Sequence, residues 1–426
     1  MKKLLLIFVT VGMMMSLVAC GEDSGSDNPT NNESSQAVEN NQKDDTSDKA
    51  DADSGKEDQK DDSGLTVDSE YENLKASEGF VFESNGDGTC TLTEIGSCTD
   101  DVIVIPEKSP SGDKVTLIGE HAFYDAEDIK SVIFAGLTTE IDKKAFQSCS
   151  FEKLVITGCK LEVGEYAFSY NEDITEILIC NSEIEVGEYA FYDCGDDMTV
   201  EVKNCTGLLD SKSFQSSCIK DLTIKDCEIE VGEYAFSYCE DITNLLIADC
   251  TMELGSYAFY DAGKDMVVSL SSNKLTMEEK AFQSAYVTTL TITGSDTVID
   301  EYAFSYCEDL TDVTIDANST EIGSYAFYDC TSLVNVNIAV DSTDDSLSII
   351  IDDKAFQSCS VEKVVIGKGA VEVGDYAFSY CEDLTSVEFK GNSLEVGNYA
   401  FYDCPEELVV TYKGNTYDGE SIEDVK

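Results

Sequence analysis

The stretch FEKLVITGCKLEVGEYAF, residues 151–168, decides the fold of this chain. Its apolar residues keep a fixed spacing, at Phe151, Leu154, Ile156, Cys159 and Leu161. The same spacing recurs later, at Ile219, Leu222, Ile224, Cys227 and Ile229, and at Ile242, Leu245, Ile247, Cys250 and Met252. We expect each copy to form a short parallel strand at its V-x-I core, to turn at the cysteine position, and to return through EVGEYAF on a convex side.

The Ala-Phe pair at the end of the stretch counts the copies. Its phenylalanines are separated by 22 or 23 residues with a single gap of 29, and they are Phe123, Phe146, Phe168, Phe191, Phe214, Phe236, Phe259, Phe282, Phe304, Phe327, Phe356, Phe378 and Phe401. The letters after Phe cycle through YD, QS and SY, so three rungs form a larger unit of 68 residues, and the wide gap indicates an insertion over 339–346. Since no rung can bury its apolar face alone, the rungs must stack around one continuous core.

These spacings fit the L-x-x-L-x-L-x-x-[NC]-x-L template of a leucine-rich repeat. The span from about 79 to 426 resembles the bacterial surface leucine-rich repeat family typified by the BspA adhesin, whose rungs read approximately LTSVTIPxSVTxIGxxAFxxC. The proline that follows the strand in that family is kept here mainly as Pro106. The resemblance implies a β-rich solenoid of about 13 rungs of 22–23 residues with short parallel strands, and a role at the cell surface.

The N-terminus is typical of an exported lipoprotein. Lys2 and Lys3 precede an apolar run from Leu4 to Ala19, which is typical of a secretory signal and too short to span a membrane. The run ends in LVAC, which resembles a bacterial lipobox and implies cleavage before Cys20 with a lipid on its sulfur; a conventional cleavage site is the alternative. We therefore expect the protein at the bacterial cell surface, lipid-anchored to the outer face of the cytoplasmic membrane of a Gram-positive cell.

Composition divides the chain into five parts. Residues 1–19 are the signal, and 20–70 are the lipidated cysteine and a disordered tether, because positions 21–70 hold 16 acidic residues against 4 lysines and no aromatic residue. A β-hairpin cap and the first strand are expected over 71–118, since NGDG at 85–88 is typical of a hairpin turn. The solenoid follows over 119–404, and a C-terminal cap over 405–426.

Seventeen cysteines in an exported chain suggest a disulfide framework, but their positions favour burial. Eight lie three residues after the Phe, where other rungs have alanine: Cys149, Cys194, Cys239, Cys307, Cys330, Cys359, Cys381 and Cys404. Four more occupy the turn, where other rungs have asparagine: Cys159, Cys205, Cys227 and Cys250. Such columns need a small buried side chain, so we expect mostly free thiols; disulfides between stacked rungs are the alternative.

The chain offers little for catalysis or metal binding. Its single histidine, His121, stands in a column that holds tyrosine in other rungs, and there is no CxxC pair and no glycine-rich phosphate loop. We expect no enzyme activity, no metal and no cofactor. From residue 71 onward, 70 acidic and 21 basic residues give a net charge of −49, which repels nucleic acid and anionic lipid. The only expected membrane contact is the lipid on Cys20.

The first candidate binding surface is the middle residue of each strand, which should face out of a concave sheet. This column reads Ile133, Val155, Leu178, Glu201, Thr223, Leu246, Ser269, Thr291, Thr314, Asn337, Val365 and Glu388. Its N-terminal part is apolar, which predicts an exposed partner patch formed by Ile133, Val155, Leu178 and Leu246. Drift at unconstrained positions is the alternative.

The second candidate surface is aromatic. Of 21 tyrosines, 17 lie two before, one after or two after the Phe; the column before it includes Tyr166, Tyr189, Tyr234, Tyr257, Tyr302 and Tyr325. Rows of such rings can stack on sugars or form protein hot spots. Alternatively, they cover the convex core and contact one another between rungs.

The leading hypothesis is a cell-surface lipoprotein that presents a repeat scaffold for binding a protein or glycan of a host or neighbouring cell, as an adhesin does. Two other hypotheses stay open: a structural envelope component that associates with itself along the array, and a lipoprotein that captures substrates for uptake.

Overall fold

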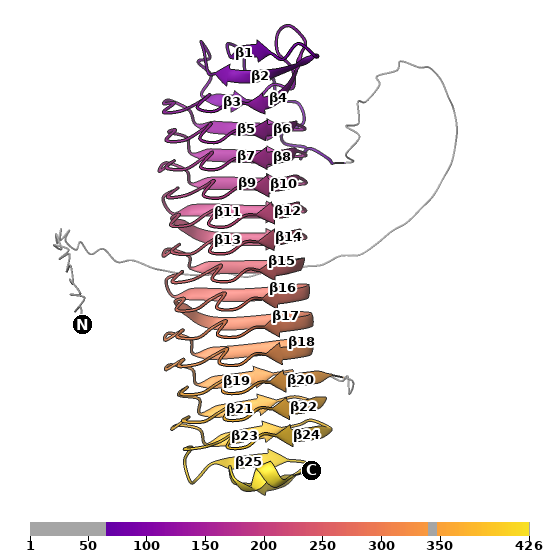
Figure 1. Ribbon diagram of the computed structural model, residues 1–426, viewed down its shortest axis with the longest axis vertical. Helices are drawn as coiled ribbons and strands as arrows, with labels where there is room; N and C mark the ends of the chain where they lie inside the picture. The colour runs from indigo at the N-terminus through magenta and orange to yellow at the C-terminus, as the bar shows by residue number, and fades with distance from the viewer. Residues whose placement is uncertain (1–64, 340–346, 426) are drawn as a thin grey trace, which may run out of the picture. The chain divides into compact units, whose positions relative to one another are not determined.

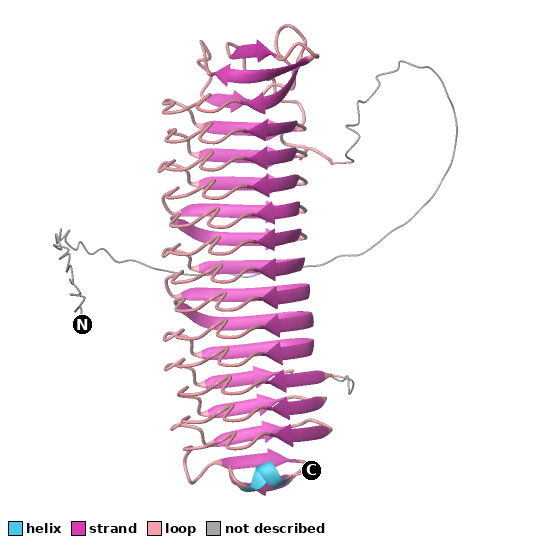
Figure 2. Ribbon diagram, viewed as in Figure 1, coloured by secondary structure: helices cyan, strands magenta, loops and turns pink. Residues whose placement is uncertain are grey.

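The computed structural model describes residues 65–339 and 347–425, which belong to one compact unit, Gln59–Lys426. The expected signal, Cys20 and the tether up to residue 64 lie outside the described residues, as does most of the expected insertion. The described part is a β-solenoid in which each rung carries two strands in succession and then a strand-free return (Figures 1 and 2).

The first strand of each rung pairs in parallel with the first strand of the next. This first column contains β3 (Val102–Val104), β5 (Ser131–Ala135), β7 (Lys153–Thr157), β9 (Glu176–Cys180), β11 (Met198–Lys203), β13 (Ile219–Lys225), β19 (Asn335–Ile338), β21 (Lys363–Ile366), β23 (Ser386–Phe389) and β25 (Val409–Tyr412). In four central rungs the strand continues into the second column: β15 (Asn244–Leu254), β16 (Met266–Met277), β17 (Val287–Ile299) and β18 (Asp312–Ile322).

The second column is a parallel ladder that the sequence analysis missed. It contains β2 (Thr89–Glu94), β4 (Lys114–Ile118), β6 (Thr138–Ile141), β8 (Lys160–Val163), β10 (Glu183–Val186), β12 (Thr206–Leu209), β14 (Glu228–Val231), β20 (Ser348–Ile351), β22 (Ala370–Val373) and β24 (Ser393–Val396). The sequence predicted that the return begins at the letters EV, directly after Leu161. In β8, however, Leu161 and Val163 are buried while Glu162 is exposed, the two-residue alternation of a strand.

The two columns meet at a corner, which confirms the turn expected at the cysteine position. The corner residue lies just before that position and has a left-handed backbone, with φ of 62° at Gly158, 53° at Asn181 and 54° at Asp226. Glycine, asparagine and aspartate adopt this conformation more readily than other residues, which explains the composition of the corner.

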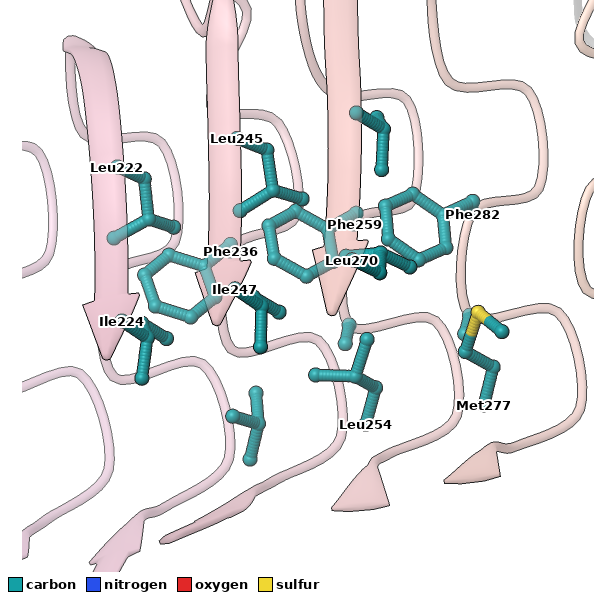
Figure 3. Close-up of a cluster of buried hydrophobic side chains, with 14 of the residues drawn as sticks. Leu222, Ile224, Phe236, Leu245, Ile247, Leu254, Phe259, Leu270, Met277 and Phe282 are labelled. Carbon is teal, nitrogen blue, oxygen red and sulfur yellow. The ribbon is translucent and has the colours of Figure 1, made fainter. Parts of the chain in front are cut away.

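The thirteen phenylalanines form one column through the core. Every ring stacks on the ring of the next rung, with centroids 4.4 Å apart between Phe123 and Phe146 and 5.6 Å apart between Phe378 and Phe401 at the two ends. Figure 3 shows three of these rings, Phe236, Phe259 and Phe282, packed against the leucines and isoleucines of the strands. The continuous core is thus confirmed, and the fourteen strands of the first column are one more than the thirteen rungs expected.

The return segment is tied to its neighbours by its backbone. The Phe168 N–H donates to the Ala190 carbonyl at 2.8 Å, and the Tyr170 N–H donates to the Tyr192 carbonyl at 2.9 Å. Tyr166 and Tyr170 both have left-handed backbones, with φ of 55° and 59°. Such a conformation costs about 1 kcal/mol or more for a residue other than glycine, so the bonds between rungs must offset strain in every return.

Both ends of the stack are capped. At the N-terminal end β1 (Val81–Ser84) pairs antiparallel with β2, which confirms the predicted hairpin. At the C-terminal end β26 (Asn415–Tyr417) pairs antiparallel with β25, and the short 3-10 helix η1 (Ser421–Asp424) packs against β24.

The cysteine columns are buried, as predicted, except for the partly buried Cys404 at the C-terminal end, and all 16 cysteines of the described part carry free thiols. The structure adds a role that small size alone did not predict. Each thiol three residues after a Phe donates a hydrogen bond to the Phe carbonyl of the preceding rung, as between Cys149 Sγ and Phe123 O at 2.8 Å. Where Ser217 replaces cysteine, its hydroxyl donates to the Phe191 carbonyl.

These thiols predict a loss of stability in alkali. Burial raises the pKa of Cys149, Cys159 and Cys194 from 9.0 to about 12. Between these values the folded chain keeps the thiols protonated while the unfolded chain releases their protons, so the free energy of unfolding should fall as pH rises from 9 toward 12.

Urea melts across this range measure the slope. Replacing Cys149 and Cys194 by alanine, which occupies the same column at Ala262 and Ala285, should make the slope shallower. An identical slope in this variant would contradict the assignment.

Candidate binding surfaces

The apolar patch predicted on the first column is not one exposed surface. Ile133 and Val155 are buried, with 5% and 0% of their surface exposed, and Leu178 is only partly exposed. Leu246 is 39% exposed, three rungs beyond Leu178. The expected exposure of Ile133 and Val155 is therefore wrong.

The patch is covered by residues 65–77, which we call the N-terminal strap. Tyr71 of the strap is buried in one cluster with Val104, Ile133 and Val155, and Val67 packs against the same cluster. Residues 65–70 thus lie on the solenoid, although the sequence analysis assigned them to the tether. This segment is short and has acidic neighbours, so its composition does not distinguish it from the tether.

Backbone hydrogen bonds fix the strap at both ends. The Asp68 N–H donates to Thr157 Oγ1 at 2.8 Å, and the Ser77 N–H donates to the Val104 carbonyl at 3.0 Å. The Val104 N–H donates in turn to Ser77 Oγ at 3.1 Å, so this end of the strap pairs with the free edge of β3.

Glycine marks the corners over which the strap passes. A Cβ atom on Gly158 would lie 2.7 Å from the Val67 nitrogen, and one on Gly136 would lie 3.3 Å from Val67 Cγ2. The next corners, away from the strap, have Asn181 and Asn204 in the same left-handed conformation. The change from glycine to asparagine is the sequence signal that could have revealed the strap.

The tyrosines gather into four equivalent clusters, one in each three-rung unit. Each cluster has four rings, and the clusters are Tyr166, Tyr170, Tyr189 and Tyr192; Tyr234, Tyr238, Tyr257 and Tyr260; Tyr302, Tyr306, Tyr325 and Tyr328; and Tyr376, Tyr380, Tyr399 and Tyr402. The six rings predicted as an aromatic face are thus brought together in pairs. The alternative, that the rings contact one another between rungs, is confirmed.

One geometry repeats in every cluster. In the first, Tyr166 and Tyr189 stack with centroids 4.9 Å apart, and Tyr192 stands perpendicular to both. Tyr170 packs edge-on against Tyr192 at 5.6 Å and is 41% exposed. Because the stacked faces contact each other, these pairs present ring edges and hydroxyl groups to solvent.

In three of the four clusters, the rung after the stacked pair carries a lysine two residues before its Phe. Its ammonium nitrogen lies 5.0 Å from the centroid of the second ring for Lys212 and Tyr189, and 4.8 Å for Lys354 and Tyr325. Lys354 Nζ also donates a hydrogen bond to the Tyr325 hydroxyl at 2.5 Å. The distances to the centroids are typical of cation–π interactions. This lysine was not predicted, although it occupies the tyrosine position in every third rung, as in the letters EKAF and DKAF.

Burial raises the pKa of Tyr166, Tyr234 and Tyr302, the first ring of three clusters. Neighbouring tyrosines and glutamates shift the pKa in the same direction. The hydroxyl groups therefore stay protonated well above neutral pH and can donate hydrogen bonds. His121, expected at the surface, is exposed and packs edge-on against Tyr124 at 5.1 Å.

The outer face of the second column is acidic. Glu140, Glu162 and Glu185 lie side by side in three successive rungs. Further along, Glu253 shares a hydrogen bond with Glu278, which raises the pKa of Glu253. The described residues contain no group of three or more potential metal ligands, and no helix among them is long and apolar enough to cross a membrane.

A parallel β-solenoid with one Phe per rung and a polar corner is a leucine-rich repeat architecture. The BspA-type leucine-rich repeat region matches in six copies over residues 107–220, 207–334 and 349–418. The chain belongs to this family.

Three solved structures are similar to the chain. A leucine-rich repeat protein from Bacteroides ovatus ATCC 8483 is 20% identical over 75% of this chain and 94% of its own, with a TM-score of 0.32. A leucine-rich cell surface protein from Faecalibacterium prausnitzii A2-165 is 18% identical over 74% and 95%, with a TM-score of 0.30. The pneumococcal vaccine antigen PcpA is 13% identical over 80% and 94%, with a TM-score of 0.27. No curated protein matches the chain.

The strap can be detached by one substitution. We expect Gly158→Asn to displace residues 65–77, because asparagine accepts the left-handed corner but its Cβ would overlap the Val67 backbone. Limited proteolysis should then cut within the strap, while the thermal melt of the solenoid changes little.

The matched control is Asn181→Gly, which removes a side chain from the equivalent corner where no strap passes. Equal cleavage of the strap in wild type and Gly158→Asn would show that Gly158 does not make room for it.

Proposed function

We propose that this chain is a surface-displayed adhesion protein that holds a partner protein against its tyrosine clusters. The observation that carries the proposal is the repetition of one half-exposed group of four rings in all four three-rung units. Tyrosine is enriched among the residues that dominate binding energy at protein interfaces. Stacking already restricts the motion of these rings, so they lose little further conformational entropy when a partner binds.

The dimensions support a partner of protein size. Strands in a sheet lie about 4.8 Å apart, so clusters three rungs apart are separated by roughly 14 Å and the four span roughly 43 Å. A standard protein interface covers about 800 Å² on each partner, which corresponds to a strip about 19 Å wide along the four clusters. Ring faces that contact one another are less available for stacking on sugars, which favours a protein over a glycan.

The apolar patch of the first column supports binding less well, because the strap occupies it. Self-association by strand pairing is also less well supported, since hairpins cap both ends of the stack and β26 is only three residues long. Display of the solenoid on the cell surface, by a lipid on Cys20 and an acidic tether, is part of the proposal and rests on the sequence LVAC and the composition that follows it.

Four substitutions test the surface without disturbing the fold. Tyr170, Tyr238, Tyr306 and Tyr380 stand in a column where other rungs place Ser148, Ser216, Ser284 and Ser358 in the same left-handed conformation. Replacing all four tyrosines by serine should therefore preserve the thermal melt. If each ring contributes about 1 kcal/mol, retention of cells that display the full chain on cultured epithelial or bacterial cell layers should fall at least tenfold.

The control is Leu246→Ser on the first column, which should adhere like wild type. Normal adhesion of the folded tyrosine variant, or an equal loss in the control, would refute the proposal.

A further inference from the structure

The lysines of the first three clusters show that the second ring of each stacked pair accepts a cation, in part through its hydroxyl group, as in the hydrogen bond from Lys354 Nζ to the Tyr325 hydroxyl at 2.5 Å. Lys212 lies 5.0 Å from the Tyr189 centroid, Lys280 lies 5.2 Å from Tyr257, and Lys354 lies 4.8 Å from Tyr325. In each case the lysine comes from the rung that follows the stacked pair. The chain therefore fills the same cation position three times.

After the fourth cluster the chain adds one more strand to the first column, β25, but no further Phe-bearing return. Its second stacked ring, Tyr399, is 55% exposed, whereas the equivalent rings of the other clusters are partly buried. No cation among the described residues lies over Tyr399. The position that a lysine occupies in the other clusters is thus open at the C-terminal end of the array.

The C-terminal cap replaces the backbone of the missing return but not its lysine. Inside the array, the N–H of Tyr376 donates to the Asn398 carbonyl of the next rung at 3.1 Å. At the end, the backbone N–H groups of Tyr399 and Ala400 act instead on the carboxylate of Glu423 and lower its pKa, against the burial that raises it. The cap therefore brings a carboxylate close to this backbone but supplies no lysine, and Tyr399 stays exposed.

The surroundings of Tyr399 suit a positive charge. Tyr376 stacks behind it at 5.3 Å, and Tyr402, which is 47% exposed, stands perpendicular to it at 6.0 Å, so the two exposed rings form an aromatic corner. Glu420 and Asp375 lie near enough to Glu423 to act on it electrostatically. Aromatic faces with nearby carboxylates attract ammonium and guanidinium groups.

We infer that the corner of Tyr399 and Tyr402 is a binding site for an organic cation, filled by a lysine or arginine side chain of the partner protein. This inference deepens the proposed function, because it assigns a basic partner to one of the four clusters. The net charge of −49 over residues 71–426 attracts such a partner to the surface, and the corner fixes one of its cationic side chains.

The test uses tetramethylammonium and the full chain with isotope-labelled tyrosine rings. In a titration at about 0.15 M salt, where screening limits long-range attraction, the NMR signals of Tyr399 and Tyr402 should shift and saturate. Those of Tyr189 and Tyr257, which lysines cover, should not. Tyr399→Leu should weaken binding by roughly fivefold or more, while the control Tyr257→Leu should leave it unchanged.

A second variant tests the argument from the lysines. Lys354→Met should uncover Tyr325 and make its ring respond to the same probe. A silent Tyr399, a uniform response of all tyrosines, or a silent Tyr325 in this variant would overturn the inference. So would a response of Tyr399 that appears only after Lys426→Ala, since the chain's own last residue would then fill the site.

The two proposals fail separately. The titration reads the isolated protein and depends on no partner, so a shift at Tyr399 with normal adhesion of the four-tyrosine variant would refute the adhesion surface alone. Strong loss of adhesion in that variant with a silent Tyr399 would refute the cation site alone.

Discussion

Stacking of phenylalanine on phenylalanine is the interaction on which the rest of this solenoid depends. A single rung encloses too few residues to bury its own apolar side chains, so each ring must find its contacts in the rungs above and below. Twelve successive stacks supply them, from Phe123 to Phe401. The same stacking brings the return segments into register, so that backbone N–H groups, cysteine thiols and tyrosine rings all meet their partners in the neighbouring rung. Fixed spacing of the Phe thus determines the spacing of everything at the surface.

That register explains why the surface carries a repeated pattern. The column two residues before the Phe reads tyrosine, tyrosine, lysine over successive rungs, so that the two tyrosines stack face to face and the lysine contacts the second ring and its hydroxyl group. Within the array, the tyrosines and lysines of this column contact one another and stabilise the stack. At the C-terminal end no lysine follows Tyr399, which is therefore exposed and available to a ligand. The opposite end follows a different rule, because the strap covers the first rungs and removes their apolar residues from solvent.

The sequence allowed much of the fold to be predicted, because the repeated spacing constrains the strands of the first column, the corner and the number of rungs. The second strand was missed although Lys160–Val163 alternates as a strand should, since the family template draws attention to the first strand. The apolar patch was wrong for a different reason: Ile133 and Val155 do face out of their strands, but a segment far away in sequence covers them. Spacing within a repeat contains no information about a cover outside the repeat. Only Gly136 and Gly158, at corners where later rungs have asparagine, indicated it.

Native-state hydrogen exchange on Phe259→Ala tests most directly whether the ring column couples the rungs. Phe259 lies between Phe236 and Phe282, at 5.1 and 4.7 Å. Removing a buried Phe typically costs about 3–5 kcal/mol. If stacking holds the array together, protection should fall at the amides of Phe236 and Phe282, which donate to the carbonyls of Ala258 and Ala303, as well as at residue 259. Loss of protection confined to the substituted rung, with its neighbours as protected as in wild type, would contradict the account.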